Sequence, residues 1–136
     1  MPMLQPGKTK FRKEQRGRLR GTAATGNTLH FGEYGMQSME TAFLTVNQIE
    51  AARKALTHFF KRSGKIWVRV LADKPYSSRP AETRMGGGKG APEYFVARVR
   101  RGHILFEVSG VKQNEAEEGF RLASFKLPVK VRLVKA

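Results

Sequence analysis

Apolar side chains between positions 45 and 64 recur every three or four residues, the spacing that places them on one face of an α-helix. Thr45 and Gln48 have the spacing of a capping box, and Gly64 stands where a glycine commonly ends a helix. The residues of this apolar face are Val46, Ile49, Ala52, Leu56, Phe59 and Phe60. We therefore expect an amphipathic helix whose apolar face packs on the rest of the protein.

A second amphipathic helix is predicted before Pro128, because apolar residues again repeat at helical spacing. Asn114 and Glu117 have the spacing of a capping box, and acidic residues are concentrated in the first turn, where the helix dipole favours them. Gly119 inside this segment costs about 1 kcal/mol relative to alanine. The expected buried side is made of Ala116, Phe120, Ala123 and Leu127.

Alternating apolar and polar residues predict strands in other parts of the chain. The strongest signals are at residues 65–71 (KIWVRVL), 94–99 (YFVARV), 104–108 (ILFEV) and 129–134 (VKVRLV), with weaker ones at 28–31 (TLHF) and 41–45 (TAFLT). A short connection containing Gly102 separates 94–99 from 104–108, so we expect these two strands to form a hairpin. Together the elements predict an α+β fold of one domain over residues 1–136, a mostly antiparallel sandwich with both helices on one face.

Two segments lack periodicity and carry a net positive charge. Residues 1–27 contain seven basic residues and one acid, Glu14, so this N-terminal arm is expected to order only against a partner, the alternative being a solvated tail. Residues 73–93 contain three prolines and four glycines. A loop of about 20 residues inside a compact domain is generally functional, although a flexible linker is the alternative here.

The balance of 26 lysines and arginines against 11 acidic residues gives a net charge of +15, which attracts polyanions. Nucleic acid is the first candidate partner and an anionic membrane surface the second. No apolar run approaches the roughly 20 residues of a membrane-spanning helix, and the apolar face of the first helix is needed for the core, so no membrane partner is expected. The chain has no cysteine, which excludes disulfides and thiolate metal sites.

The stretch TRMGGGKGAPEY, residues 83–94, raises the question of a nucleotide phosphate site. A nucleotide-binding loop requires serine or threonine after its lysine and then a helix, whereas Lys89 is followed by glycine, alanine, proline and a predicted strand. Nucleotide hydrolysis is therefore not expected. The glycines instead allow the backbone to approach a polynucleotide closely, with Arg79, Arg84 and Lys89 providing charge.

Residues able to carry catalysis are few and scattered. His30, His58 and His103 have no acid or cysteine at metal-ligand spacing, so each is expected to be an RNA contact or a structural histidine. The acidic residues near the start of the second helix are explained by the helix dipole. We therefore expect no enzyme, no metal, no cofactor and no small-molecule substrate.

Basic residues interleaved with aromatic ones suit structured RNA, where phosphates provide affinity and rings stack on exposed bases. KTKFRK (8–13) and HFFKR (58–62) have this composition, and Phe11, in an otherwise polar arm, is the better stacking candidate. On the first predicted helix, Lys54, His58, Lys61 and Arg62 recur three or four positions apart and are expected to form a basic ridge, unless this is merely a solvated face.

Several stretches occur in a recognisable order. They are MLQPGKTKFRKEQRGR, NQIEAARKAL, GKIWVRV, DKP, RPAETRMGGGKGAPEYFVARV, and LFEVSGV followed by EGFRLASFKLP. In this order the chain resembles, over nearly its whole length, the bacterial and organellar large-subunit ribosomal protein sixteen family. It departs from the family at Gly87, where a lysine is usual, and at Phe95, where tryptophan is common.

The resemblance implies an α+β sandwich without enzymatic activity that binds large-subunit rRNA and joins the large subunit late in assembly. It further implies contact with tRNA and with neighbouring ribosomal proteins, close to the peptidyl transferase centre, on a cytoplasmic or an organellar ribosome. A basic RNA-binding protein outside the ribosome remains the alternative function.

Charge pattern and resemblance together give two groups of expected site residues. The rRNA-binding group consists of Lys8, Lys10, Phe11, Arg12, Lys13, Arg16, Arg18, Arg20, Lys54, His58, Lys61 and Arg62. The loop expected near tRNA and the peptidyl transferase centre consists of Arg79, Arg84, Met85, Gly86, Gly87, Gly88, Lys89 and Gly90. Arg84 is also a candidate modification site, because the matching arginine is hydroxylated in some members of the family.

Overall fold

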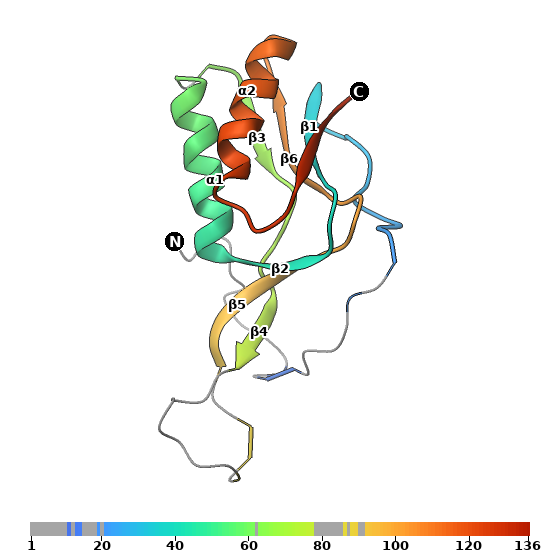
Figure 1. Cartoon of the computed structure of the whole chain (residues 1–136), viewed down its shortest axis with the longest axis vertical. Helices are drawn as coiled ribbons and strands as arrows, with labels where there is room; N and C mark the ends of the chain where they lie inside the picture. Colours follow the sequence, from blue (N-terminus) through green and yellow to red (C-terminus); the bar gives the residue numbers. More distant parts are fainter. Residues whose placement is uncertain are drawn as a thin grey trace.

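The computed structural model describes residues 11, 13–14, 19, 21–61, 63–77, 86, 88–89 and 92–136 (Figure 1). The elements follow in the order β1 (Tyr34–Ser38), β2 (Ala42–Thr45), α1 (Val46–Phe59), β3 (Lys65–Val68), β4 (Lys74–Ser77), β5 (Pro92–Val99), β6 (Ile104–Ser109), α2 (Gln113–Ser124) and β7 (Val131–Lys135). Both predicted helices and all four of the stronger strand predictions are present, which confirms the α+β class.

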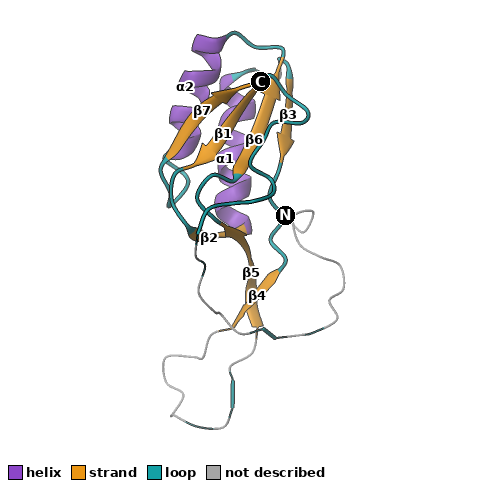
Figure 2. Cartoon of the chain, turned by 90° about the vertical axis from the view of Figure 1, so that its right-hand side faces the viewer, coloured by secondary structure: helices purple, strands orange, loops and turns teal. Residues whose placement is uncertain are grey.

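The strands form two antiparallel sheets. The first has the order β3-β6-β1-β7, and the second has the order β2-β5-β4. Figure 2 shows α1 and α2 on one face of the first sheet, while the second sheet lies toward the opposite end of the molecule from α2. The prediction that both helices cover one face is therefore confirmed.

The predicted hairpin between β5 and β6 is wrong. A tight turn does join them, because the His103 N–H donates to the Arg100 carbonyl at 3.1 Å and Gly102 has a φ of +95°. However, β5 pairs with β2 and β4, whereas β6 pairs with β1 and β3. A turn sets only the local direction of the chain and does not decide which strands pair. Here both edges of β5 and both edges of β6 are paired with other strands, so β5 and β6 belong to different sheets and the chain crosses between the sheets at this turn.

The alternation pattern misses β1. Gly35 and Gln37 interrupt its apolar character, although β1 lies inside the first sheet between β6 and β7. A Cβ on Gly35 would lie 2.2 Å from the end of the Leu29 side chain, so a larger residue at this position would have to displace Leu29. The weak strand signal at 28–31 is wrong, since this segment contains only bends and irregular backbone.

The predicted loop at 73–93 is shorter than expected, because β4 and β5 occupy its two ends and pair with each other. Lys74, which contributes to the apparent charge of the loop, is buried in β4, with its ammonium nitrogen 4.9 Å from the centroid of the Phe43 ring. Burial lowers the pKa of Lys74. The start of the segment therefore belongs to the folded body.

The predicted start of α1 is confirmed and its predicted end is wrong. The Thr45 hydroxyl accepts the Gln48 N–H at 3.2 Å, and the Gln48 side chain accepts the Thr45 N–H at 3.0 Å. Beyond the helix, Lys61 rather than Gly64 is the first residue with a left-handed backbone, at a φ of +50°. Gly64 also has a positive φ, and a Cβ there would lie 2.2 Å from the Ser109 carbonyl oxygen, so this glycine serves the packing against β6.

The capping residues predicted for α2 are also wrong. The N-cap is Lys112 rather than Asn114. The Glu115 carboxylate, rather than that of Glu117, accepts the backbone N–H of the N-cap residue, at 3.4 Å. A lysine side chain accepts no hydrogen bond, so only the glutamate half of a capping box is possible, and a search for Ser, Thr, Asn or Asp at the N-cap misses it.

The core lies between the two helices and the first sheet. Met36 and Phe106 from the sheet are fully buried, as is Leu56 from α1, and the predicted apolar face of α2 is buried as expected. A Cβ on Gly119 would lie 2.8 Å from the Phe60 ring. The glycine that weakens α2 locally therefore permits the close approach of α2 to the end of α1.

Candidate nucleic-acid interface

The arm and the loop, predicted as separate cationic segments, meet in the structure. The Lys13 ammonium donates to the Lys89 carbonyl at 2.8 Å, and the Lys89 ammonium donates to the Glu14 carbonyl. Gly86 and Gly88 have φ values of +100° and +93°, and a Cβ on either glycine would meet no atom within 4 Å. The described residues of the loop and the arm thus bring two lysines near a backbone that is open to solvent and whose positive φ angles strongly favour glycine.

The last residues of the predicted arm belong to the folded body. Thr22 forms a parallel bridge with Arg101, and the Ala23 N–H donates to the Arg101 carbonyl at 2.8 Å. The Ile104 N–H donates to the Gly26 carbonyl at 2.8 Å. The expectation that all of residues 1–27 order only against a partner is therefore wrong for this end, because backbone groups at the turn between β5 and β6 bind it.

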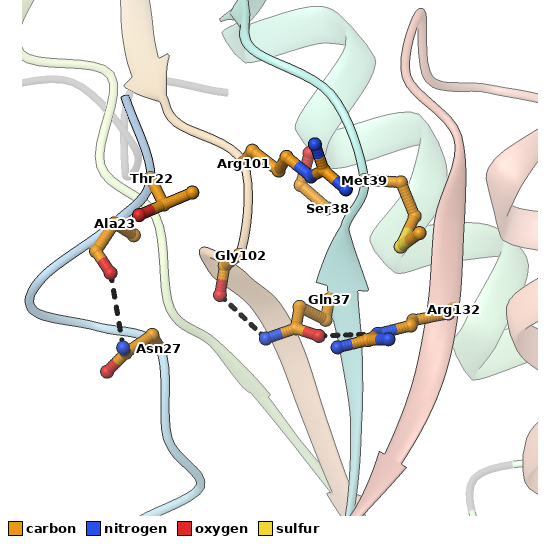
Figure 3. A pocket seen from close by; sticks show the side chains of 9 residues that line it. All are labelled: Thr22, Ala23, Asn27, Gln37, Ser38, Met39, Arg101, Gly102 and Arg132. Atoms are coloured by element: carbon orange, nitrogen blue, oxygen red, sulfur yellow. Dashed lines mark hydrogen bonds between the residues drawn. The ribbon is translucent and has the colours of Figure 1, made fainter. Parts of the chain in front are cut away.

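The contact between residues 22–23 and Arg101 lies at the edge of a polar pocket (Figure 3). Its described lining consists of Thr22, Ala23, Asn27, Gln37, Ser38, Met39, Arg101, Gly102 and Arg132. The buried Gln37 donates to the Gly102 carbonyl at 2.9 Å and accepts from Nε of Arg132 at 2.7 Å. Gln37 therefore orients the Arg132 guanidinium, and no acidic side chain is among these nine lining residues. Two arginines and several neutral polar groups make the pocket suitable for an anion.

The basic ridge on α1 is only partly described. Lys54 and His58 are exposed on the helix, and Lys61 is exposed immediately after it. Nearby, Arg53 pairs with Glu50, and this hydrogen bond lowers the pKa of Glu50 against the opposing effect of burial. One cation next to the ridge is thus already neutralised within the protein.

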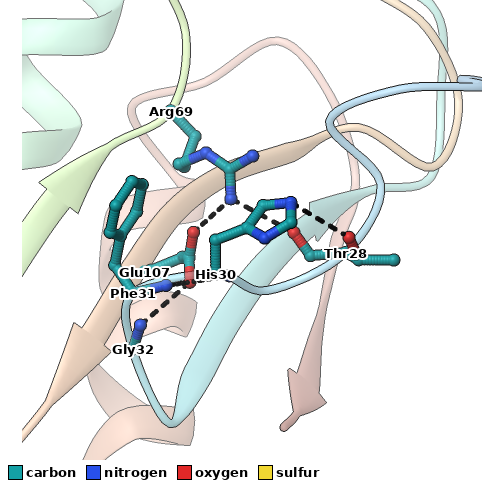
Figure 4. Close-up of polar contacts among 6 residues, drawn as sticks. All are labelled: Thr28, His30, Phe31, Gly32, Arg69 and Glu107. Atoms are coloured by element: carbon teal, nitrogen blue, oxygen red, sulfur yellow. Dashed lines mark hydrogen bonds and ion pairs between the residues drawn. The ribbon is translucent and has the colours of Figure 1, made fainter.

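A buried carboxylate, which the sequence pattern does not single out, holds the segment before β1 (Figure 4). Oε1 of Glu107 accepts the backbone N–H groups of His30, Phe31 and Gly32 at 3.0, 2.9 and 2.9 Å. Oε2 pairs with Arg69, which also donates to a backbone carbonyl of the same segment. The one available signal is a glutamate within the apolar run ILFEV.

The pKa of Glu107 follows from this environment. Complete burial of the side chain acts to raise the pKa. The Gly32 and Phe31 amides, the Arg69 guanidinium and the His30 amide stabilise the charged form and together lower the pKa below its ordinary value. Glu107 is therefore an ionised structural anchor.

His103 has a structural environment. A Cβ on Gly26 would lie 3.3 Å from Nε2 of the His103 ring, which shows how closely the ring packs on the attached end of the arm. Burial lowers the pKa of His103. This favours a neutral imidazole, in keeping with the structural alternative predicted for this histidine.

A family model for ribosomal protein L16p/L10e matches residues 6–134. The chain belongs to this family. The resemblance seen in the sequence motifs is thereby confirmed.

Relatives of this L16p/L10e chain cover almost its whole length. The large ribosomal subunit protein uL16 of Trichodesmium erythraeum (strain IMS101) is 58% identical over 132 residues, which cover 97% of this chain and 96% of that protein. The large ribosomal subunit protein uL16c of Porphyra purpurea is 55% identical over 132 residues, with 97% and 95% covered. The uL16c of Gracilaria tenuistipitata is also 55% identical, with 97% and 98% covered.

The structure of this L16p/L10e chain describes part of the predicted site. The predicted residues that it describes are Phe11, Lys13, Lys54, His58, Lys61, Gly86, Gly88 and Lys89. Those outside the described residues are Lys8, Lys10, Arg12, Arg16, Arg18, Arg20, Arg62, Arg79, Arg84, Met85, Gly87 and Gly90. Arg101 and Arg132 are absent from the prediction, because the sequence does not reveal that the turn after β5 and the strand β7 line one pocket.

Two further observations concern metal ligands and membrane-spanning helices in the described part of this L16p/L10e chain. Across the described ranges, no group of three or more histidine, cysteine or acidic side chains is arranged to hold a metal ion. Among the same residues, no helix has the length and apolar character needed to cross a bilayer.

Proposed function

We propose that this chain is a structural, non-catalytic protein of the large ribosomal subunit and that it binds large-subunit rRNA. The observation that carries this proposal is the identity of 55–58%, over nearly the full length, with proteins named large ribosomal subunit protein uL16 or uL16c. The net charge of +15 supports a polyanionic partner. We place the chain on a cytoplasmic or organellar ribosome.

In this proposal, the joined arm and loop bind RNA as one unit. Lys13 and Lys89 each donate to a backbone carbonyl, and each ammonium group retains further N–H donors for phosphate oxygens. Neutralising phosphates releases counterions, which favours binding and makes it sensitive to salt. Gly86 and Gly88 present no side chain, so the backbone can approach RNA closely.

The polar pocket lined by Arg101 and Arg132 is proposed as a phosphate contact. Nε of Arg132 is bound to Gln37, so the terminal nitrogens of the guanidinium remain the donors for a ligand. Arginine binds phosphate with paired, directional hydrogen bonds, which gives more geometric selectivity than lysine. Arg101 contributes a second positive charge to the same pocket.

Contacts with tRNA, with neighbouring ribosomal proteins and with the region of the peptidyl transferase centre are further parts of the proposal, as is a role in late assembly. They come from the resemblance to the family. The position of Lys89 beside the arm, which brings two cationic segments to one place, supports only an RNA contact there. The contributions of Arg79 and Arg84, and hydroxylation of Arg84, remain predictions from the resemblance.

Sedimentation of a cell lysate on a density gradient tests the proposal. A tagged chain is expected to sediment with the large subunit at moderate salt and to leave it as salt is raised. Ribonuclease treatment should abolish the fast-sedimenting fraction. A chain that stays near the top of the gradient, or that spreads with RNA of all sizes, would refute the ribosomal role. Fractionating organelles first identifies the compartment.

A further inference from the structure

Phe31 is an exposed aromatic residue with a second ring against it. Phe31 is 59% exposed, and its ring stacks on that of Trp67 with centroids 5.9 Å apart and an interplanar angle of 22°. The Arg69 guanidinium carbon lies 5.6 Å from the centroid of the Phe31 ring. Phe31, Trp67 and Arg69 therefore form a small platform, of which Phe31 is the most exposed ring.

The backbone that carries Phe31 is held by hydrogen bonds to two adjacent residues of β6. The Phe31 N–H is one of the three that donate to the buried Glu107, and the Glu33 N–H donates to the Val108 carbonyl at 2.9 Å. A Cβ on Gly32 would lie 2.6 Å from that same carbonyl oxygen, so the segment is pressed against β6. A buried carboxylate thus holds an apolar ring at the surface in one position, which lowers the entropy lost when a ligand binds.

We propose that Phe31, supported by Trp67 and Arg69, is a stacking site for an unpaired nucleobase of RNA. The inference rests on the proposed RNA-binding function and adds to it a specific base contact. Single-stranded RNA binds to proteins by stacking of bases on aromatic rings and guanidinium planes, within a positive field that attracts the backbone. The net charge of +15 provides that field.

Charge pairing explains why a base is the expected ligand rather than a phosphate. The charge of Arg69 is matched by Glu107, so the platform has little net charge of its own to offer a phosphate. What it presents is the ring of Phe31. Stacking is tolerant of base identity, because every base has a π-face.

Phe125 provides a matched comparison elsewhere on the surface. It is 68% exposed, and the Arg121 guanidinium carbon lies 5.4 Å from its ring centroid, much as Arg69 does for Phe31. Arg121, however, pairs with Glu118 at the surface, and the acidic residues of α2 lie on the same helix. Phe125 thus has similar exposure and a similar cation, but it lies at the end of α2, apart from the platform.

The test uses the full chain and two RNA probes of equal charge, a single-stranded oligoadenylate and an A-form duplex. Phe31→Leu is expected to weaken binding of the oligoadenylate by about ten-fold, a loss in the range for one stacked base, and to leave duplex binding nearly unchanged. The salt dependence should not change, because no charge is removed. Phe125→Leu should bind both probes as the wild type does.

Trp67 gives a second, independent readout, because it is the only tryptophan of the chain. A base stacked at the platform is expected to change tryptophan emission of the wild type, and Phe31→Tyr, which keeps a ring, should preserve this response. This measurement needs no destabilised variant. An emission spectrum unchanged at saturating oligoadenylate would overturn the inference even if Phe31→Leu failed to fold.

The possible results separate this inference from the proposed function. If the wild type binds neither RNA probe, both the proposed RNA-binding function and the stacking site are wrong. If it binds both probes and Phe31→Leu binds oligoadenylate equally well, the stacking site is wrong while RNA binding stands. If Phe31→Leu instead impairs only incorporation into the large subunit, the ring contacts a protein, and the proposed base contact is again overturned.

Discussion

Lys13 and Lys89 are joined by a hydrogen bond of 2.8 Å from an ammonium group to a backbone carbonyl, although 76 positions separate them in the sequence. Because Lys89 in turn donates to the carbonyl of Glu14, the contact is reciprocal. Each lysine side chain is thus tied to a neutral backbone acceptor of the other segment. We therefore expect the arm and the loop to be interdependent in the proposed RNA binding.

Replacing Lys89 with glutamine is therefore expected to weaken binding to large-subunit rRNA and to reduce the slope of log affinity on log salt by about one. Affinity should be measured over a range of salt concentrations. Lys126→Gln is the control, because Lys126 is an exposed lysine beyond α2 and the substitution changes net charge equally. Equal effects of the two substitutions would show that only net charge matters.

The polar pocket lined by Arg101 and Arg132 gives a second prediction. Replacing both Arg101 and Arg132 with glutamine should reduce the salt slope by about two, since two phosphate-directed cations are lost. Arg132→Lys should recover only part of the affinity, because lysine lacks the paired donors of a guanidinium.

Arg121→Gln serves as the comparison for the pocket variants, because Arg121 is an arginine at the surface already paired with Glu118. Its RNA affinity is expected to stay close to that of the wild type. Circular dichroism of each variant checks that the fold is retained. A pocket variant that binds RNA like Arg121→Gln would argue against a phosphate contact at this place.

Glu107→Gln is expected to lower the free energy of unfolding by about 3–5 kcal/mol, because it leaves the Arg69 guanidinium without its charged partner and replaces an acceptor oxygen with an NH₂ group. Denaturant unfolding measures this change. Glu118→Gln removes an exposed carboxylate that also pairs with an arginine, and it should unfold like the wild type. Similar losses in both variants would contradict the role of burial.

Ionisation of Glu107 is expected to make the stability of the folded protein depend on pH in the acidic range. Its pKa is lowered in the folded protein, so the carboxylate contributes stability above the ordinary glutamate pKa of about 4.3, and that contribution is lost as pH falls through the folded pKa. The midpoint of denaturant unfolding should therefore decrease with acidification below this range. Glu107→Gln should show a flatter decrease, and an identical curve would refute the assignment.

The elements predicted well from the sequence are those specified by local chemistry. The capping box of Thr45 and Gln48 and the apolar spacing of both helices need only neighbouring residues. The crossing of the chain between sheets at Gly102 depends on pairings with β1, β2, β3 and β4, so a hairpin motif is not sufficient to predict it. The structural role of Glu107 likewise cannot be predicted from its neighbours in the sequence, because its backbone hydrogen-bond donors lie at residues 30–32.

The candidate site divides in the same way. Charge and glycine content identify the arm and the loop as separate cationic segments, and composition alone cannot reveal that Lys13 and Lys89 touch. Arg101 comes from the turn after β5 and Arg132 from β7, and only the sheet order brings them to one pocket. The sequence pattern places Phe31 in a weak strand, whereas its exposed position follows from the three amides bound by Glu107.

The position of β1 has a consequence for how the protein is made. Both neighbours of β1 come from the last third of the chain, with Tyr34 opposite Val108 in β6 and opposite Lys135 in β7. During synthesis, β1 therefore emerges long before either partner exists. The four-stranded sheet can therefore close only after residues 131–135 of β7 have been synthesised, and both edges of β1 stay unpaired until β6 has emerged.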